Sequence, residues 1–301
     1  MPGRPAARSF PRSEPIRSTY VVGAIALLLL FIPAIPASAT TAPVTSTGKT
    51  LEAIDTSAVM WRYSVNDGTL EGRTQIAQHP FNKDVFTKST EQFIKTDWDG
   101  DGIPDLVTRL DNGYLIMQPG RADNGDYDPY RIIGFGGWEN YDINAVKLNK
   151  TDKYPGLVAR DTASGNLYYY PNTSGGQLSA PRTQIGFGGW TPMTEISAMD
   201  WDTDGNMDLI VRNPYGDLKL YRTDGAGAIL EEARPTVDFG WDVMDHIAIE
   251  HNFAGAGSVG IIARNGNGYL FYYPISNGKV QLATIIGRGG WGGYKIAAGA
   301  P

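Results

Sequence analysis

The sequence predicts an all-β fold: a five-bladed β-propeller whose blades are four-stranded antiparallel sheets. One observation is a set of periodic tryptophans, which lie 52, 51 and 50 residues apart: Trp138, Trp190, Trp241 and Trp291. A second is that short runs rich in Ile, Val, Leu and Tyr alternate with Asn-Gly, Ser-Gly and Tyr-Gly turns, and no segment sustains a helical period. Four short strands in an interval of this length are typical of propeller blades.

The blades are expected to follow one another along residues 51–301. In the interval from Trp190 to Trp241, strands are predicted at 196–199, 209–212, 218–221 and 235–239. The repeat also sets approximate blade boundaries: 82–133, 134–185, 186–238, 239–286, and a composite of 287–301 with 51–81. We expect the N- and C-terminal strands to join in this composite blade, because closure hides sheet edges that would otherwise pair with other chains.

Residues 1–39 have the pattern of a secretory signal peptide. Four arginines precede an apolar run at 21–35, and small residues at 37–39 form a cleavage site. A membrane anchor is the alternative, but the apolar run is short and the cleavage site follows it. We therefore expect a secreted, extracellular protein with no membrane insertion after signal cleavage, in which residues 40–50 form a disordered polar tether.

Composition narrows the choice of partners. The chain has 301 residues, a net charge of −6 and no cysteine. Residues 1–39 carry four arginines and one glutamate, so the predicted mature chain is more acidic still. An acidic chain argues against a nucleic-acid partner, which needs a basic face on the protein. Without disulfides, stability must come from a large core, from metal, or from both.

Two acidic loops have the spacing of a calcium site. Carboxylates stand at the first, third, fifth and ninth positions, glycine stands at the sixth, and the seventh would contribute its backbone carbonyl. The predicted ligands are Asp97, Asp99, Asp101, Ile103 and Asp105 in the first loop, and Asp200, Asp202, Asp204, Asn206 and Asp208 in the second. Two other repeats hold residues such as Leu148 and Ala254 at these positions, so we expect two calcium sites and not four. A metal-free Asp-Gly turn is the alternative, but its converging carboxylates would repel one another.

The corners that contain the periodic tryptophans are the candidate ligand sites. Three of them end in Gly-Gly-Trp, and a Gly-Gly step lets backbone amides approach a ligand closely. Aromatic rings with polar tips suit sugars, and the predicted ligand-binding residues are Trp138 with Tyr141, Trp190, Trp241, and Trp291 with Tyr294. The alternative is that each tryptophan packs between blades. A periodic arginine set is expected to bridge neighbouring blades: Arg109, Arg160, Arg212 and Arg264.

These motifs resemble two known groups of propellers. The string Asp-x-Asp-x-Asp-Gly-x-x-Asp-Leu before a strand is similar to the FG-GAP/VCBS repeat of integrin-α-like propellers. The strings Gly-Gly-Trp-x-x-Tyr/Met and Gly-x-Leu-Tyr-x-Tyr resemble five-bladed tachylectin-like lectins, and secreted actinobacterial proteins often carry such modules. The resemblance covers about residues 50–301. It implies that the aspartates of both loops are structural calcium ligands, and the lectin group implies carbohydrate binding.

Catalysis has little support in the sequence. The only histidines are His79, His246 and His251, and they have neither a period nor metal-ligand spacing. We therefore expect a non-enzymatic, calcium-stabilised propeller that binds a glycan or cell-wall polysaccharide on a cell surface or cell wall. One alternative is a protein-binding scaffold or targeting subunit of an extracellular assembly, such as a secreted antibacterial toxin particle, with other secreted proteins as partners. Another is a glycoside-active enzyme that would use paired carboxylates.

Overall fold

The computed structural model describes residues 49–76, 89–123 and 125–299. The predicted signal peptide and most of the predicted tether lie outside the described residues, although Thr50 already belongs to the first strand. Within the described ranges, no helix has the length and apolar character needed to cross a membrane.

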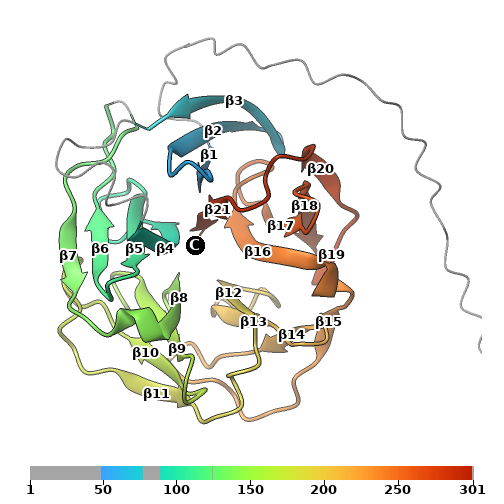
Figure 1. Cartoon of the computed structure of the whole chain (residues 1–301). Helices are drawn as coiled ribbons and strands as arrows, with labels where there is room; N and C mark the ends of the chain where they lie inside the picture. Colours follow the sequence, from blue (N-terminus) through green and yellow to red (C-terminus); the bar gives the residue numbers. More distant parts are fainter. Residues whose placement is uncertain (1–48, 77–88, 124, 300–301) are drawn as a thin grey trace, which may run out of the picture. The chain divides into compact units, whose positions relative to one another are not determined.

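The described residues fold into five sheets arranged around a central axis, as Figure 1 shows, and this confirms the predicted fold class. From the axis outward, the composite blade contains β21 (Lys295–Ile296), β1 (Thr50–Ile54), β2 (Met60–Asn66) and β3 (Thr69–Gln75). The next contains β4 (Thr90–Thr96), β5 (Asp105–Leu110), β6 (Leu115–Gln118) and β7 (Arg131–Gly134).

The other three blades repeat this plan, again given from the axis outward. One contains β8 (Tyr141–Val146), β9 (Gly156–Asp161), β10 (Leu167–Tyr170) and β11 (Thr183–Gly186). The following one contains β12 (Glu195–Met199), β13 (Asp208–Arg212), β14 (Leu218–Tyr221) and β15 (Thr236–Asp238). The last contains β16 (Met244–His251), β17 (Val259–Asn265) and β18 (Leu270–Ser276), and β18 pairs with both β19 (Lys279–Val280) and β20 (Thr284–Gly287).

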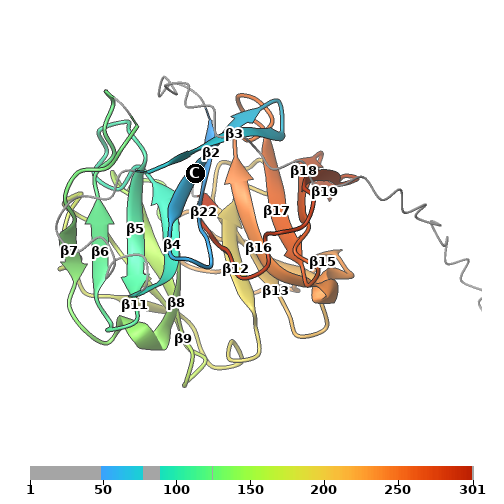
Figure 2. The same cartoon turned by 45° about the horizontal axis from the view of Figure 1, so that its top comes forward.

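The ends of the described chain close the ring in two ways. β21 pairs antiparallel with β1, with Ala53 opposite Ile296, so the composite blade contains strands from both ends. The chain then crosses to the next blade, where β22 (Ala298–Gly299) pairs parallel with β4 on its inner edge (Figure 2). The joining of the two ends follows the expectation from the sequence, whereas the parallel β22–β4 pairing was not expected.

The hydrophobic core lies between blades. Inner strands are buried on both faces: in β9 the first five residues are buried, which is why it reads as an almost continuous apolar run. Outer strands such as β10 alternate buried and half-buried residues. Among the described residues there are five core clusters, and each joins side chains of two neighbouring blades. No blade therefore buries its apolar faces without its neighbours.

Acidic loops and tryptophan corners lie at opposite ends of the innermost strands. The first acidic loop connects the end of β4 to the start of β5, and the second connects β12 to β13. A tryptophan corner instead connects the outermost strand of one blade to the innermost strand of the next, as Trp138 does between β7 and β8. The two predicted types of site therefore occupy opposite faces of the propeller.

Candidate functional site

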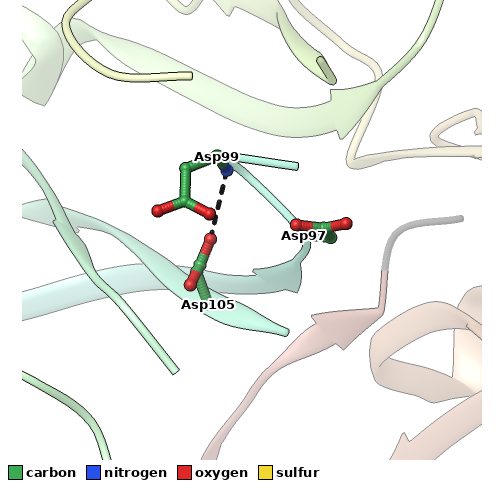
Figure 3. Close-up of side chains that lie close together, drawn as sticks. All are labelled: Asp97, Asp99 and Asp105. Carbon is green, nitrogen blue, oxygen red and sulfur yellow. Dashed lines mark hydrogen bonds between the residues drawn. The ribbon is translucent and has the colours of Figure 1, made fainter. Parts of the chain in front are cut away.

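The first acidic loop brings three of its predicted ligands together. Carboxylate oxygens of Asp97, Asp99 and Asp105 all lie within 4.8 Å of one another (Figure 3). Gly102 at the sixth position has φ +88°, a conformation that a side chain would strain. Asp101 lies outside this cluster, and its Oδ1 accepts a hydrogen bond of 2.8 Å from the N–H of Ile103 within the loop.

Asp105 also holds the loop in shape. It is the first residue of β5 and is fully buried. Its Oδ2 accepts hydrogen bonds from the backbone N–H groups of Trp98 (2.8 Å) and Asp99 (3.3 Å), and its Oδ1 accepts one from Gly120 (2.8 Å). Burial raises the pKa of Asp105 to about 6; these backbone bonds oppose the shift and the charge of Asp99 adds to it.

Two carboxylate oxygens of this cluster suit a cation. Oδ1 of Asp97 and Oδ1 of Asp99 are buried and have no hydrogen-bond partner among the described residues. Burial, together with the charge of Asp101, raises the pKa of Asp99, so the carboxylates disfavour one another's ionised form. Calcium prefers oxygen ligands of this kind in flexible loops, so the donors present fit such an ion.

The second acidic loop forms an equivalent cluster but differs in the charge beside it. Oxygens of Asp200, Asp202 and Asp208 lie within 4.8 Å of one another. Asp204 is again outside the cluster, and its carboxylate accepts hydrogen bonds from the backbone N–H (2.8 Å) and the side-chain amide (2.9 Å) of Asn206. The difference is Arg222, whose Nη1 lies 3.4 Å from Oδ2 of Asp202 and already supplies positive charge there.

The two remaining loops of this type contain hydrogen-bonded polar side chains in place of a cluster of carboxylates. Asp152 accepts a hydrogen bond of 2.5 Å from the hydroxyl of Tyr169. Oδ1 of Asn252 accepts one of 2.7 Å from the N–H of Gly257. Within the part of the chain that the structure describes, only the two aspartate loops form clusters of three potential ligands.

The periodic tryptophans are buried between blades. Their exposed fractions are between 3% and 8%. Each ring lies with its centroid 4.7 Å from that of a tyrosine in the following blade: the pairs are Trp138–Tyr170, Trp190–Tyr221, Trp241–Tyr273 and Trp291–Tyr63. A Cβ at Gly134 would overlap Nε1 of Trp138, and Gly186 and Gly287 have the same relation to their tryptophans. The rings therefore space the blades, and a ligand at a corner would contact mainly the groups around them.

The periodic arginines bridge neighbouring blades, as expected. Nη1 of three of them donates a hydrogen bond to the carbonyl of the next periodic tryptophan: Arg160 to Trp190 (3.1 Å), Arg212 to Trp241 (3.0 Å) and Arg264 to Trp291 (3.1 Å). Arg109 is held more loosely, since its Nη1 lies 3.5 Å from the carbonyl of Glu139.

An open pocket of ≈550 Å³ lies beside the corner at Trp138. Gly136, Gly137, Asn140, Tyr141, Asp161, Tyr170 and Arg182 are among its lining residues. Nη1 of Arg182 donates hydrogen bonds to the hydroxyls of Tyr141 (2.7 Å) and Tyr170 (2.6 Å), and its guanidinium carbon lies 3.8 Å from the ring centroid of Tyr168. An exposed cation is thus fixed against aromatic rings at the pocket wall.

Related arrangements occur at two further corners. Beside Trp291, Nη1 of Arg73 donates a hydrogen bond of 3.2 Å to the hydroxyl of Tyr63, and Tyr294 packs 5.2 Å from the tryptophan ring. Beside Trp190, Arg234 lies 4.9 Å from the ring centroid of Tyr221.

Sequence reasoning predicted Tyr141 and Tyr294 at these corners but missed the three arginines and their other tyrosine partners. The available signal was an arginine within or just before the outermost strand of three blades: Arg73 in β3, Arg182 before β11 and Arg234 before β15. The corner at Trp241 has Tyr273 but Ala283 in place of the arginine.

Comparisons with known proteins carry no argument about the family or function of this chain. No protein-family model and no curated protein matches the chain. The chain is similar to the crystal structure of BP39L lectin from Burkholderia pseudomallei, with 13% identity and a TM-score of 0.44 over 77% of this chain and 68% of that one. It is also similar to AofleA from Arthrobotrys oligospora, with 12% identity and a TM-score of 0.44 over 79% of this chain and 67% of that one. A third similar structure is BBS1N in complex with ARL6DN, with 16% identity and a TM-score of 0.35 over 66% of this chain and 57% of that one. Similarities at this level do not extend to function.

Proposed function

We propose that this chain is a non-catalytic, carbohydrate-binding propeller that uses the pockets beside its tryptophan corners. The observation that carries the proposal is the pocket at Trp138, where an aromatic wall, the guanidinium of Arg182, the carboxylate of Asp161 and the amide of Asn140 surround an open space. Such a wall suits a sugar, because rings cover its C–H faces while polar groups bond its hydroxyls.

Repetition of the arrangement supports binding to a repetitive ligand. Arginine, tyrosine and tryptophan meet again at Trp291 and at Trp190. Several weak sites on one rigid body gain avidity when the ligand presents many copies of the same sugar. A glycan coat or cell-wall polysaccharide is such a ligand, and the predicted signal peptide would deliver the protein to it outside the cell.

Calcium is the proposed cofactor of both acidic loops. Asp97, Asp99 and Asp105 would hold one ion, and Asp200, Asp202 and Asp208 a second. The ion would supply charge neutralisation to converging carboxylates, which is a structural role. Because these loops lie on the face opposite the tryptophan corners, calcium would stabilise the blades and would not contact the sugar.

Glycan binding to the mature chain tests the carbohydrate proposal. We expect binding to at least one polysaccharide on a glycan array and in a cell-wall pull-down. The double variant Arg73→Ala/Arg182→Ala should weaken this binding by about tenfold or more, because it removes the cation from two sites that act together. Arg121→Ala is the matched control, since Arg121 is an exposed arginine that pairs with Asp123 away from the corners.

Two results would contradict the proposal. One is that no polysaccharide retains the protein, and the other is that the double variant, with unchanged melting temperature, binds as the parent does. Hydrolysis of chromogenic glycosides by the parent would instead favour a glycoside-active enzyme.

Protein binding is a second candidate that one observation favours. Phe135, Phe187 and Phe239 precede three of the tryptophan corners, and they are 62%, 80% and 75% exposed. Large exposed aromatic side chains repeated on one face are typical of an interaction surface. If the protein is a scaffold or targeting subunit, replacing all three by serine should abolish capture of a secreted partner, whereas the arginine variants should keep it.

A further inference from the structure

A second pocket lies where the innermost strands of the propeller meet. Its volume is ≈290 Å³, close to the lower end of small-molecule pockets, which span ~300–1,000 Å³. Every blade contributes to its wall, through β4, β8, β12, β16 and β21; the residues are, in that order, Gln92, Asp142, Glu195, His246 and Lys295. This axial pocket is separate from the pocket at the Trp138 corner, and nothing in the proposed carbohydrate binding uses it.

Most charges around the axial pocket are paired. The pairs are Asp142–Arg160, Glu195–Arg212, Asp245–Arg264 and Glu91–Lys295. Arg109, which lines the pocket, has no carboxylate within ion-pair distance among the described residues. Gln92 lies opposite it in the β4–β5 ladder, at the position that Asp142 and Glu195 occupy in their own blades. The pocket therefore contains one guanidinium whose charge is not compensated.

Three nitrogens of lining residues also lack partners. Nε of Arg109, Nε of Arg160 and Nε2 of His246 are buried and make no hydrogen bond within the described ranges. Arg160 is only 7% exposed. Burial, together with the charge of Arg264, lowers the pKa of His246 to about 4, so this ring is uncharged at neutral pH.

Gln92 cannot compensate Arg109. Its Oε1 accepts a hydrogen bond of 3.0 Å from the N–H of Ile143, and its Nε2 donates one of 2.7 Å to the carbonyl of that residue. Buried donors and charges are costly unless something pairs with them. The wall thus offers an unpaired cation beside carboxylates that can accept further hydrogen bonds.

We infer that the axial pocket binds a small carboxylate ligand that also carries hydroxyl or ammonium groups. Its carboxylate would pair with Arg109, because the guanidinium fork matches a carboxylate in geometry and charge. Its donors would face Asp142 and Glu195, which a bare inorganic anion could not satisfy. A monosaccharide acid and a free amino acid share this chemistry, and both are compatible in size with the pocket.

Isothermal titration calorimetry with four probes tests the ligand chemistry on the full propeller. The probes are D-glucuronate, D-glucose, glycine and inorganic phosphate. We expect saturable binding of glucuronate or glycine with Kd in the range of ~1–10 mM or tighter, and no binding of glucose at the same site. Binding of glucuronate would identify the ligand as a sugar acid, and binding of glycine would identify it as an amino acid. Absence of binding by both, or binding of phosphate alone, would overturn the inference.

Two variants locate the bound carboxylate. Gln92→Glu supplies the missing counterion to Arg109 and keeps an acceptor for the N–H of Ile143, so it should weaken binding at least tenfold while the chain stays folded. Arg109→Gln removes the cation and should have the same effect. Arg73→Ala/Arg182→Ala should leave this affinity unchanged, which separates the axial pocket from the carbohydrate sites. Parental affinity in a folded Gln92→Glu variant would place the carboxylate elsewhere and refute the assignment.

Discussion

At the scale of single residues, Glu250 is the clearest case of a buried carboxyl whose ionisation destabilises the folded state. It is 4% exposed on β16, and its Oε1 has no hydrogen-bond partner among the described residues. Burial raises its pKa from 4.5 to about 7; the charge of Lys95 opposes the shift and that of Glu52 adds to it. The folded state binds the proton of Glu250 more tightly than the unfolded state does. The stabilising contribution of this protonated side chain is therefore complete below pH 4.5 and is lost as the pH rises through about 7.

Glu250→Gln should therefore stabilise the protein at alkaline pH. The amide has no proton to lose, so at pH 8 the free energy of unfolding should exceed that of the parent by up to ~3 kcal/mol, and at pH 4 the two should be similar. Urea unfolding at both pH values measures this. Glu231→Gln, at an exposed position, is the control and should follow the parent. A Glu250→Gln effect of equal size at both pH values would show that titration of this carboxyl is not its cause.

At the scale of elements, the two acidic loops should respond differently to calcium. Both gather three carboxylates, but Arg222 lies beside Asp202 in the second loop. A bound cation must compete with that guanidinium, so the first loop should bind calcium more tightly. Terbium, which takes the same oxygen ligands, reports on both loops because Trp98 and Trp201 lie within them and can sensitise its emission.

Asp97→Asn should remove the tighter terbium-binding phase and Asp200→Asn the weaker one. Calcium at about 100 times the Kd of the first loop should stabilise the parent by ~3 kcal/mol through that loop, with a smaller gain through the second loop. The double variant should lose both gains. Asp111→Asn, at an exposed turn position outside both loops, is the matched control. An identical melting temperature in calcium and in EGTA would remove the case for bound calcium.

Elements also show why the sequence predicted some features and not others. Strand alternation and the Trp period are local signals, so the blades could be read from the chain. The burial of Trp138 could not be read from the chain in this way. It depends on Tyr170, which lies in the next blade and contacts the Trp138 ring only when β8, β9 and β10 have formed. The pocket role of Arg182 is equally non-local, since it is set by contacts with Tyr141 and Tyr170.

At the scale of the whole molecule, stability depends on closure. Each of the five core clusters found in the described residues joins two blades, so an unclosed ring would expose apolar surface at both of its ends. The last described strands complete the ring: β21 pairs with β1, and β22 pairs with β4. Ile296 in β21 is 4% exposed and belongs to the cluster that contains Leu51 and Trp291.

Ile296→Ala should therefore destabilise the entire propeller and not only its last strand. Loss of a buried isoleucine costs ~2–5 kcal/mol, and because closure couples the blades, the melting temperature should fall while unfolding remains a single transition. Ile285→Ala in β20 is the matched control: its side chain is 39% exposed, and the same truncation there should cost ~1 kcal/mol or less. If the two variants lost equal stability, or if Ile296→Ala produced a separate early transition, the contact of β21 with β1 would be local only, and the stability of the ring would not depend on it.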